Sequence, residues 1–91
     1  MRTYHHTTTD RWKNILNLSH WHLKMRINDV ILAREYADES IYTFRLSLLR
    51  ESYENDRFLR EFLGYRRMTK LEQRAAALLA PPSDPSAAQA P

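Results

Sequence analysis

Apolar residues between positions 41 and 63 recur at the spacing of an α-helix. On a helical wheel, the apolar positions of residues 41–53 cover a little over half of the circumference. They are Ile41, Tyr42, Phe44, Leu46, Leu48, Leu49 and Tyr53. Three later apolar residues fall on the same side of the wheel: Leu59, Phe62 and Leu63. The pattern therefore predicts one central helix with a wide core face.

Two positions bear on where this helix ends. Asn55 and Asp56 interrupt the apolar pattern, and in an alternative interpretation they cap a separate short helix by accepting hydrogen bonds from its first N–H groups. Gly64 is the only glycine and follows the last apolar position. Glycine commonly ends a helix there because it adopts the left-handed conformation without steric cost. We expect a helix over about residues 40–63.

A second long segment, residues 10–37, contains no glycine or proline that would stop a helix. One apolar stripe along it consists of Trp12, Ile15, Leu16, Ser19, Leu23, Ile27, Val30 and Ile31. Nearly opposite lies a second stripe, here called the back stripe, which consists of Leu18, Trp21, Met25, Leu32 and Tyr36. A two-helix hairpin covers only one of these faces, so another part of the chain or a partner must cover the other.

A β-strand is the alternative for residues 21–27, because apolar and polar residues alternate there at period two. The chain offers no second strand with turn signals that such a strand would need for pairing. The helical interpretation is therefore favoured.

A short third helix is predicted over about residues 69–80. Thr69 and Glu72 have the spacing of a capping box, in which hydroxyl and carboxylate each satisfy a free N–H group of the first turn. The apolar face of this helix contains Leu71, Ala75, Leu78 and Leu79. Pro81 and Pro82 end it. Upstream, Asp38, Glu39 and Ser40 reverse the chain and place acids and a capping hydroxyl ahead of the central helix.

Together these segments predict an all-α protein with a single domain at residues 10–80. Two long helices form an antiparallel hairpin, and the short third helix joins it. Residues 1–9 form an extended N-terminal arm. Residues 81–91 form a Pro/Ala-rich tail that is disordered or ordered only by a partner, because it has nothing to bury.

Composition narrows the class of protein. Without cysteine, a disulfide scaffold and a thiolate zinc site are both excluded. No apolar run approaches the length of a membrane span, about 20 residues. Fourteen Lys and Arg against eleven Asp and Glu give a net charge of +3, far from the excess of a dedicated nucleic-acid binder. We expect a soluble intracellular protein of the cytoplasm or an organelle matrix.

The residues with catalytic or metal-binding potential do not assemble into a known pattern. His20 and His22 are two apart, which places them about 200° apart on a helix, whereas chelation on a helix needs the i, i+4 spacing. The remaining histidines, His5 and His6, lie in the arm. The serines lie in helical contexts, and most carboxylates, such as Glu54 and Glu61, have basic neighbours at helical spacing, which indicates surface ion pairs. We expect no catalytic residues, no metal site and no cofactor.

A basic segment near the third helix gives a nucleic-acid hypothesis. Its cations are Arg66, Arg67, Lys70 and Arg74, which could contact phosphates while Tyr65 stacks on a base. The low net charge and the acidic middle of the chain argue against more than a limited contact.

The back stripe carries the main functional expectation. The third helix is short and alanine-rich, so it could hide part of the stripe but not both aromatic residues. Trp, Tyr and Met are enriched at protein interfaces. We therefore expect a non-enzymatic accessory or adaptor subunit of a larger protein assembly or a homo-oligomer. The alternatives are a nucleic-acid-contacting protein and a haem- or metal-carrying helical protein.

Overall fold

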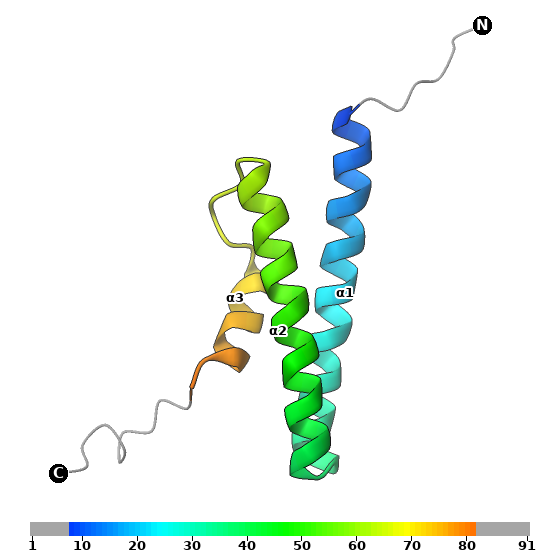
Figure 1. Ribbon diagram of the computed structural model, residues 1–91, viewed down its shortest axis with the longest axis vertical. Helices are drawn as coiled ribbons and strands as arrows, with labels where there is room; N and C mark the ends of the chain where they lie inside the picture. Colours follow the sequence, from blue (N-terminus) through cyan, green and yellow to red (C-terminus); the bar gives the residue numbers. More distant parts are fainter. Residues whose placement is uncertain (1–7, 82–91) are drawn as a thin grey trace, which may run out of the picture.

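The computed structural model describes residues 8–81, which form three α-helices: α1 (Thr8–Tyr36), α2 (Glu39–Phe62) and α3 (Lys70–Leu79). The predicted all-α hairpin with a short third helix is confirmed (Figure 1). Helix α1 begins at residue 8, so it takes in the last two residues of the predicted arm. The rest of that arm and the predicted tail beyond Pro81 lie outside the described residues.

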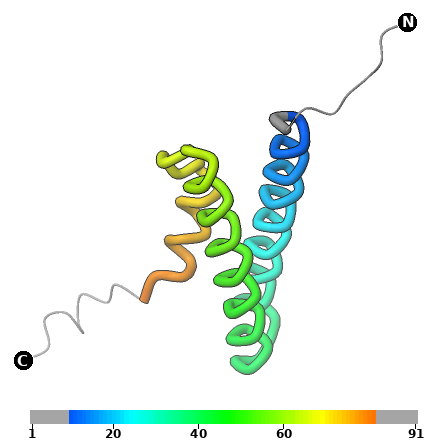
Figure 2. The backbone as a smooth tube through the Cα atoms, turned by 45° about the horizontal axis from the view of Figure 1, so that its top comes forward, coloured from blue at the N-terminus to red at the C-terminus, as the bar shows by residue number. Residues whose placement is uncertain are grey.

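The two long helices meet at a tight turn and diverge toward their other ends, so that the hairpin has the outline of a narrow V (Figures 1 and 2). The turn is fixed at Asp38, whose carboxylate accepts a hydrogen bond from the Ile41 N–H at 2.9 Å. The Ser40 hydroxyl, predicted to cap the helix, instead donates to the same carboxylate at 2.8 Å. Asp38 is therefore the N-cap of α2.

Helix α2 ends as predicted at Gly64, which has a φ of 92°. The Tyr65 N–H donates to the Arg60 carbonyl at 2.7 Å, and the Gly64 N–H donates to the Glu61 carbonyl at 3.1 Å. These two bonds are those of a Schellman motif, which needs a left-handed residue at the position of Gly64. The motif turns the chain back toward α3.

Helix α3 begins with the predicted capping box. The Glu72 N–H donates to the Thr69 hydroxyl at 3.1 Å, and the Thr69 N–H donates to the Glu72 carboxylate at 2.8 Å. Two of the N–H groups that the start of a helix leaves unpaired are thereby satisfied.

Two alternatives from the sequence are wrong. Residues 21–27 are helical, as part of α1. Their apolar and polar residues alternate because two apolar stripes run along opposite sides of this helix. Asn55 and Asp56 do not cap a separate helix, since α2 continues through them without a break.

The core lies where all three helices meet. It contains Leu23, Ile27 and Val30 of α1, Leu49 of α2 and Ala75 of α3. The partly buried residues packed against it from α2 are Tyr42, Leu46 and Tyr53. With Leu49 these positions are separated by three or four residues, which is the seam expected of two helices packed lengthwise.

The core face of α2 is narrower than the wheel predicted. Ile41, Phe44 and Phe62 were assigned to it, but 43%, 62% and 67% of their surfaces are exposed. The reason is geometric: α1 and α3 together cover only the seam side of α2, whereas the apolar arc of the sequence is wider than that. No helix within residues 8–81 has the length and apolar character needed to cross a membrane.

Candidate protein-binding surface

The back stripe of α1 lies on the surface. Its five side chains are exposed to between 43% for Leu32 and 81% for Tyr36, and Trp21 is 55% exposed. The stripe follows the helical repeat over residues 18–36, or about 27 Å at 1.5 Å per residue. It faces away from the core because the opposite side of α1 provides the buried residues Leu23, Ile27 and Val30.

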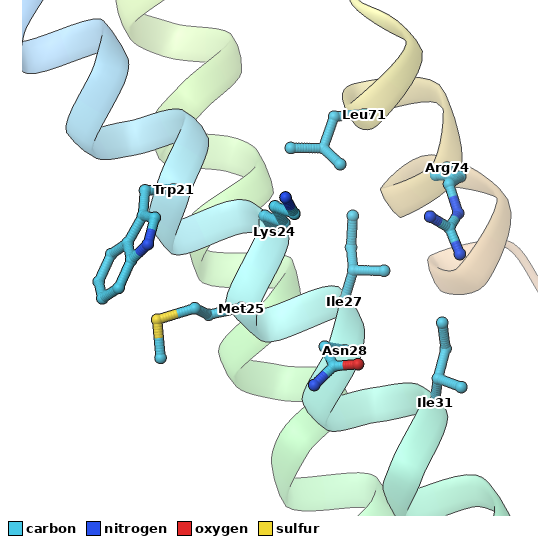
Figure 3. Close-up of a pocket in the computed structure, with 8 residues that line it drawn as sticks. All are labelled: Trp21, Lys24, Met25, Ile27, Asn28, Ile31, Leu71 and Arg74. Atoms are coloured by element: carbon cyan, nitrogen blue, oxygen red, sulfur yellow. The ribbon is translucent and has the colours of Figure 1, made fainter.

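Helix α3 does not bury this stripe but forms a groove beside it. The groove has a volume of about 350 Å³ and is lined by Trp21, Lys24, Met25, Ile27, Asn28, Ile31, Leu71 and Arg74. In Figure 3, Trp21 and Met25 project from α1 on the side away from α3, while Leu71 and Arg74 close the opposite side. Trp21 and Met25 thus form the outer rim of a groove whose far wall is α3.

The charged residues that line the two hollows beside Trp21 and Met25 are all basic. The groove contains Lys24 and Arg74, and no Asp or Glu lines it. A smaller hollow of about 150 Å³ on the same two side chains is lined by His22 and Arg26, again without an acid. Trp21 and Met25 thus form an apolar ridge with cations on both sides.

The position of α3, and with it one wall of the groove, depends on a buried ion-pair network. Glu72 and Asp56 are both fully buried. Arg57 contacts Glu72 at 2.8 Å, and Arg60 contacts Asp56 at 2.6 Å and Glu72 at 3.6 Å. Arg57 also donates to the Arg66 carbonyl at 3.2 Å, which ties down the link between α2 and α3. Every buried side-chain nitrogen and oxygen in the described part of the chain has a hydrogen-bond partner.

Because of this network, we expect the stability of the fold to depend on pH in the acid range. Burial alone would raise the pKa of the Glu72 carboxyl, but hydrogen bonds from the Thr69 N–H and from Arg57 outweigh burial and hold the pKa below its ordinary value of 4.5. A carboxylate with a lowered folded-state pKa stabilises the fold above its unfolded pKa, and this contribution is lost as the pH falls through the folded pKa.

We therefore expect the urea midpoint of the wild-type protein to fall as the pH is lowered from about 5 toward 2. The fall should be smaller in Glu72→Gln, which has no carboxyl at this position. Asp38, whose pKa is lowered by the hydrogen bonds from the Ile41 N–H and the Ser40 hydroxyl, titrates in both proteins and so cancels in the comparison. Equal slopes against pH in both proteins would show that Glu72 contributes nothing.

The interpretation of the carboxylates as surface pairs is correct for Glu61, which contacts Arg57 at 3.1 Å and is exposed. It does not hold for Asp56, which is buried; Glu72, predicted as a capping-box residue, is buried as well. The signal for Asp56 was present in the sequence, because it continues the seam of Leu49 and Tyr53 at the same three- and four-residue intervals. Arg60 follows four residues later and supplies the counter-charge.

The four cations of the nucleic-acid hypothesis are all exposed, but they do not share one site. Arg74 lines the groove with α1. Tyr65, the proposed stacking residue, lines a different hollow of about 210 Å³ with Trp12, Lys13, Leu16 and Leu63. Arg66 and Arg67 follow Tyr65 in the link, and Lys70 begins α3.

A second group of aromatic residues, of which Phe58 and Phe62 are exposed, lies where the hairpin opens, and the sequence did not indicate it. Trp12 of α1 meets Phe62 of α2 with ring centroids 5.7 Å apart. Phe58 stacks on Phe62 at 6.4 Å and is 66% exposed. Phe58 and Phe62 are four residues apart, so the i, i+4 rule would have found this pair.

His20 and His22 are exposed on α1. No group of three or more His, Asp or Glu side chains within the described residues is placed to hold a metal ion. His5 and His6 lie outside the described residues.

Comparison with known proteins finds no relative of this chain. No protein-family model matches the chain, and neither the curated proteins nor the solved structures give a match.

Proposed function

We propose that this protein is a non-enzymatic accessory or adaptor subunit, which the back stripe of α1 holds in a larger protein assembly or homo-oligomer. The observation that carries the proposal is the exposure of Leu18, Trp21, Met25, Leu32 and Tyr36 along one side of a continuous helix. Contiguous exposed apolar surface on a small protein marks a site of interaction. Helical spacing of the anchors is the form that helix-to-helix recognition takes.

The residue types in the stripe also support the proposal. Trp21, Met25 and Tyr36 belong to the types enriched in interfaces, and Trp and Tyr dominate binding energies where they are fully covered. The side chains stand on a helix whose opposite face is buried, so they are held in position before a partner arrives. Such preorganisation lowers the entropy lost on binding.

The buried charged groups support a structural rather than a catalytic use. Arg57 and Arg60 of α2 contact Glu72 of α3 and so join the two helices, and Arg60 also holds Asp56 within α2. A catalytic carboxylate needs access to substrate, whereas both of these are fully buried. This supports a non-enzymatic role.

We expect the double substitution Trp21→Glu and Met25→Glu to abolish assembly while leaving the helices formed. Truncating a central aromatic anchor commonly costs about 2 kcal/mol or more of binding free energy, which is about 30-fold in affinity. Two buried carboxylates add the cost of unpaired charges in an apolar interface. Co-purification and native mass measure assembly, and far-ultraviolet circular dichroism measures helix content.

The matched control is Ile41→Glu with Phe44→Glu, which places the same charges on exposed apolar residues of α2. The control should retain the assembly. If the α1 variant assembles normally, the proposal is wrong. If the α1 and α2 variants lose assembly equally, the assignment to the back stripe is wrong.

A further inference from the structure

We infer that the occupant of the back stripe is an acidic amphipathic helix, which lays its apolar face on Trp21 and Met25 and its carboxylates on Lys24, Arg26 and Arg74. This inference rests on the proposed function and names the class of partner. Its basis is the charge pattern around the ridge, together with the shape of the groove between α1 and α3.

Lys24, Arg26 and Arg74 belong to none of the ion pairs found within residues 8–81. The ion pairs around α3 instead join Arg57 or Arg60 to Asp56, Glu61 or Glu72. Lys24 and Arg74 line one side of the ridge and Arg26 lines the other, and no Asp or Glu lines either hollow. Complementary charge across an interface is what suppresses wrong partners and fixes orientation.

The shape of the site favours a helix. The back stripe runs for about 27 Å along a straight helix, which matches a partner helix of about five turns. The groove of about 350 Å³ is at the lower limit of small-molecule pockets, roughly 300–1,000 Å³. Its outer residues Trp21 and Met25 are about half exposed, so it cannot enclose a small ligand but can accept one or two side chains projecting from a helix.

A second copy of this chain fits less well. In a two-fold dimer the same patch faces itself. A two-fold axis beside Trp21 and Met25 would bring Lys24, Arg26 and Arg74 of one copy near the same three cations of the other. Like charges facing each other across an interface oppose binding. A partner with acids on both sides of an apolar stripe has the opposite, favourable pattern.

The test uses a synthetic peptide of about 18 residues, long enough to span the back stripe at 1.5 Å per residue. It has leucine at successive i, i+3 and i+4 positions and glutamate on both flanks. The comparison peptide carries lysine at every glutamate position. Binding is followed by the fluorescence of Trp21 in the full chain with Trp12→Phe, because the chain has two tryptophans and Trp21 then remains alone.

The acidic peptide should shift the Trp21 emission and bind about ten-fold more tightly than the lysine peptide, since several exposed ion pairs each change affinity by a small factor. Lys24→Glu with Arg74→Glu should reverse this preference. Arg66→Glu with Arg67→Glu, a matched charge reversal away from the groove, should leave the preference unchanged.

Three results would overturn the inference. The first is equal affinity for the two peptides, or none for either. The second is a dimer of the wild-type chain that already shields Trp21. The third is binding to phosphatidylglycerol vesicles without binding to the acidic peptide, which would make the surface a membrane site.

Recovery of the tagged chain from its own cells separates this inference from the proposed function. Loss of the native complex in both Trp21→Glu/Met25→Glu and Lys24→Glu/Arg74→Glu supports both. Loss in the first variant alone leaves the proposed function standing and rejects the acidic partner. Retention of the complex in both variants rejects both.

Discussion

Replacing Glu72 with alanine should lower the free energy of unfolding by about 3–5 kcal/mol, the range for removing one partner of a buried ion pair. The side chains of Arg57 and Arg60 are only 12% and 14% exposed in the intact protein, so both would lose a counter-charge in a mostly buried position, and Arg57 would lose its 2.8 Å contact. The Thr69 N–H would lose its acceptor at the same time. The substitution therefore removes a counter-charge and a helix cap together.

Chemical denaturation measures this loss, and the chain supplies a matched control. Glu61 binds the same Arg57 at 3.1 Å, but 64% of its side chain is exposed. Glu61→Ala should therefore change the free energy of unfolding by only about 0–1 kcal/mol. A Glu72→Ala variant within that same range would show that the buried network does not stabilise the protein.

The effect of Glu72→Ala should be concentrated in α3. Helix α3 has 10 residues, and a helix of that length is marginal in water without tertiary contacts. We expect hydrogen exchange to lose more protection in residues 70–79 than in α1 and α2. The groove would then lose the wall formed by Leu71 and Arg74, which connects the stability of the network to the candidate binding surface.

Those parts of the fold that depend on local chemistry could be predicted from the sequence. Gly64 marks the end of α2 in the sequence because it is the only glycine in the chain. In the described structure it is also the only residue with a positive φ. Thr69 and Glu72 mark the start of α3 because the capping box is a short-range pattern. Each of these signals is contained in a few consecutive residues.

The assignment of apolar residues to core or surface could not be predicted in the same way. A helical wheel shows that Phe44 and Leu49 both lie on the apolar arc of α2, but it does not show how wide a face the other helices cover. The structure leaves Phe44 62% exposed and buries Leu49 completely. The decision depends on where α3 packs, which is a long-range property.

One part of the candidate site, the back stripe, could be predicted from the sequence, and the other part, the groove, could not. The periodicity of α1 was sufficient to define the back stripe. The groove was not foreseen, because it needs Arg74 of α3 to lie beside Lys24 of α1. From the sequence, Arg74 was grouped instead with Arg66 and Arg67, its near neighbours in the chain.

Leu49→Ala should lower the free energy of unfolding by about 2–5 kcal/mol, the usual range for truncating a buried leucine. Leu49 is fully buried and belongs to the cluster that joins α1, α2 and α3, with Leu23 and Ala75 among its members. Its truncation leaves a cavity where three helices meet, and no single helix can shift to fill it without losing its other contacts. Thermal or urea unfolding measures the change.

Phe44→Ala is the control that separates position from hydrophobicity. Phe44 is on the same helix and has the larger apolar side chain, but it is mostly exposed. Its replacement should change the free energy of unfolding by no more than about 0.5 kcal/mol, as is usual for surface positions. A loss at Phe44 comparable to that at Leu49 would mean that α2 buries its outer face, and that the three helices alone are not the complete fold. A small loss would instead leave the outer face of α2, like the back stripe of α1, as apolar surface that the core does not use.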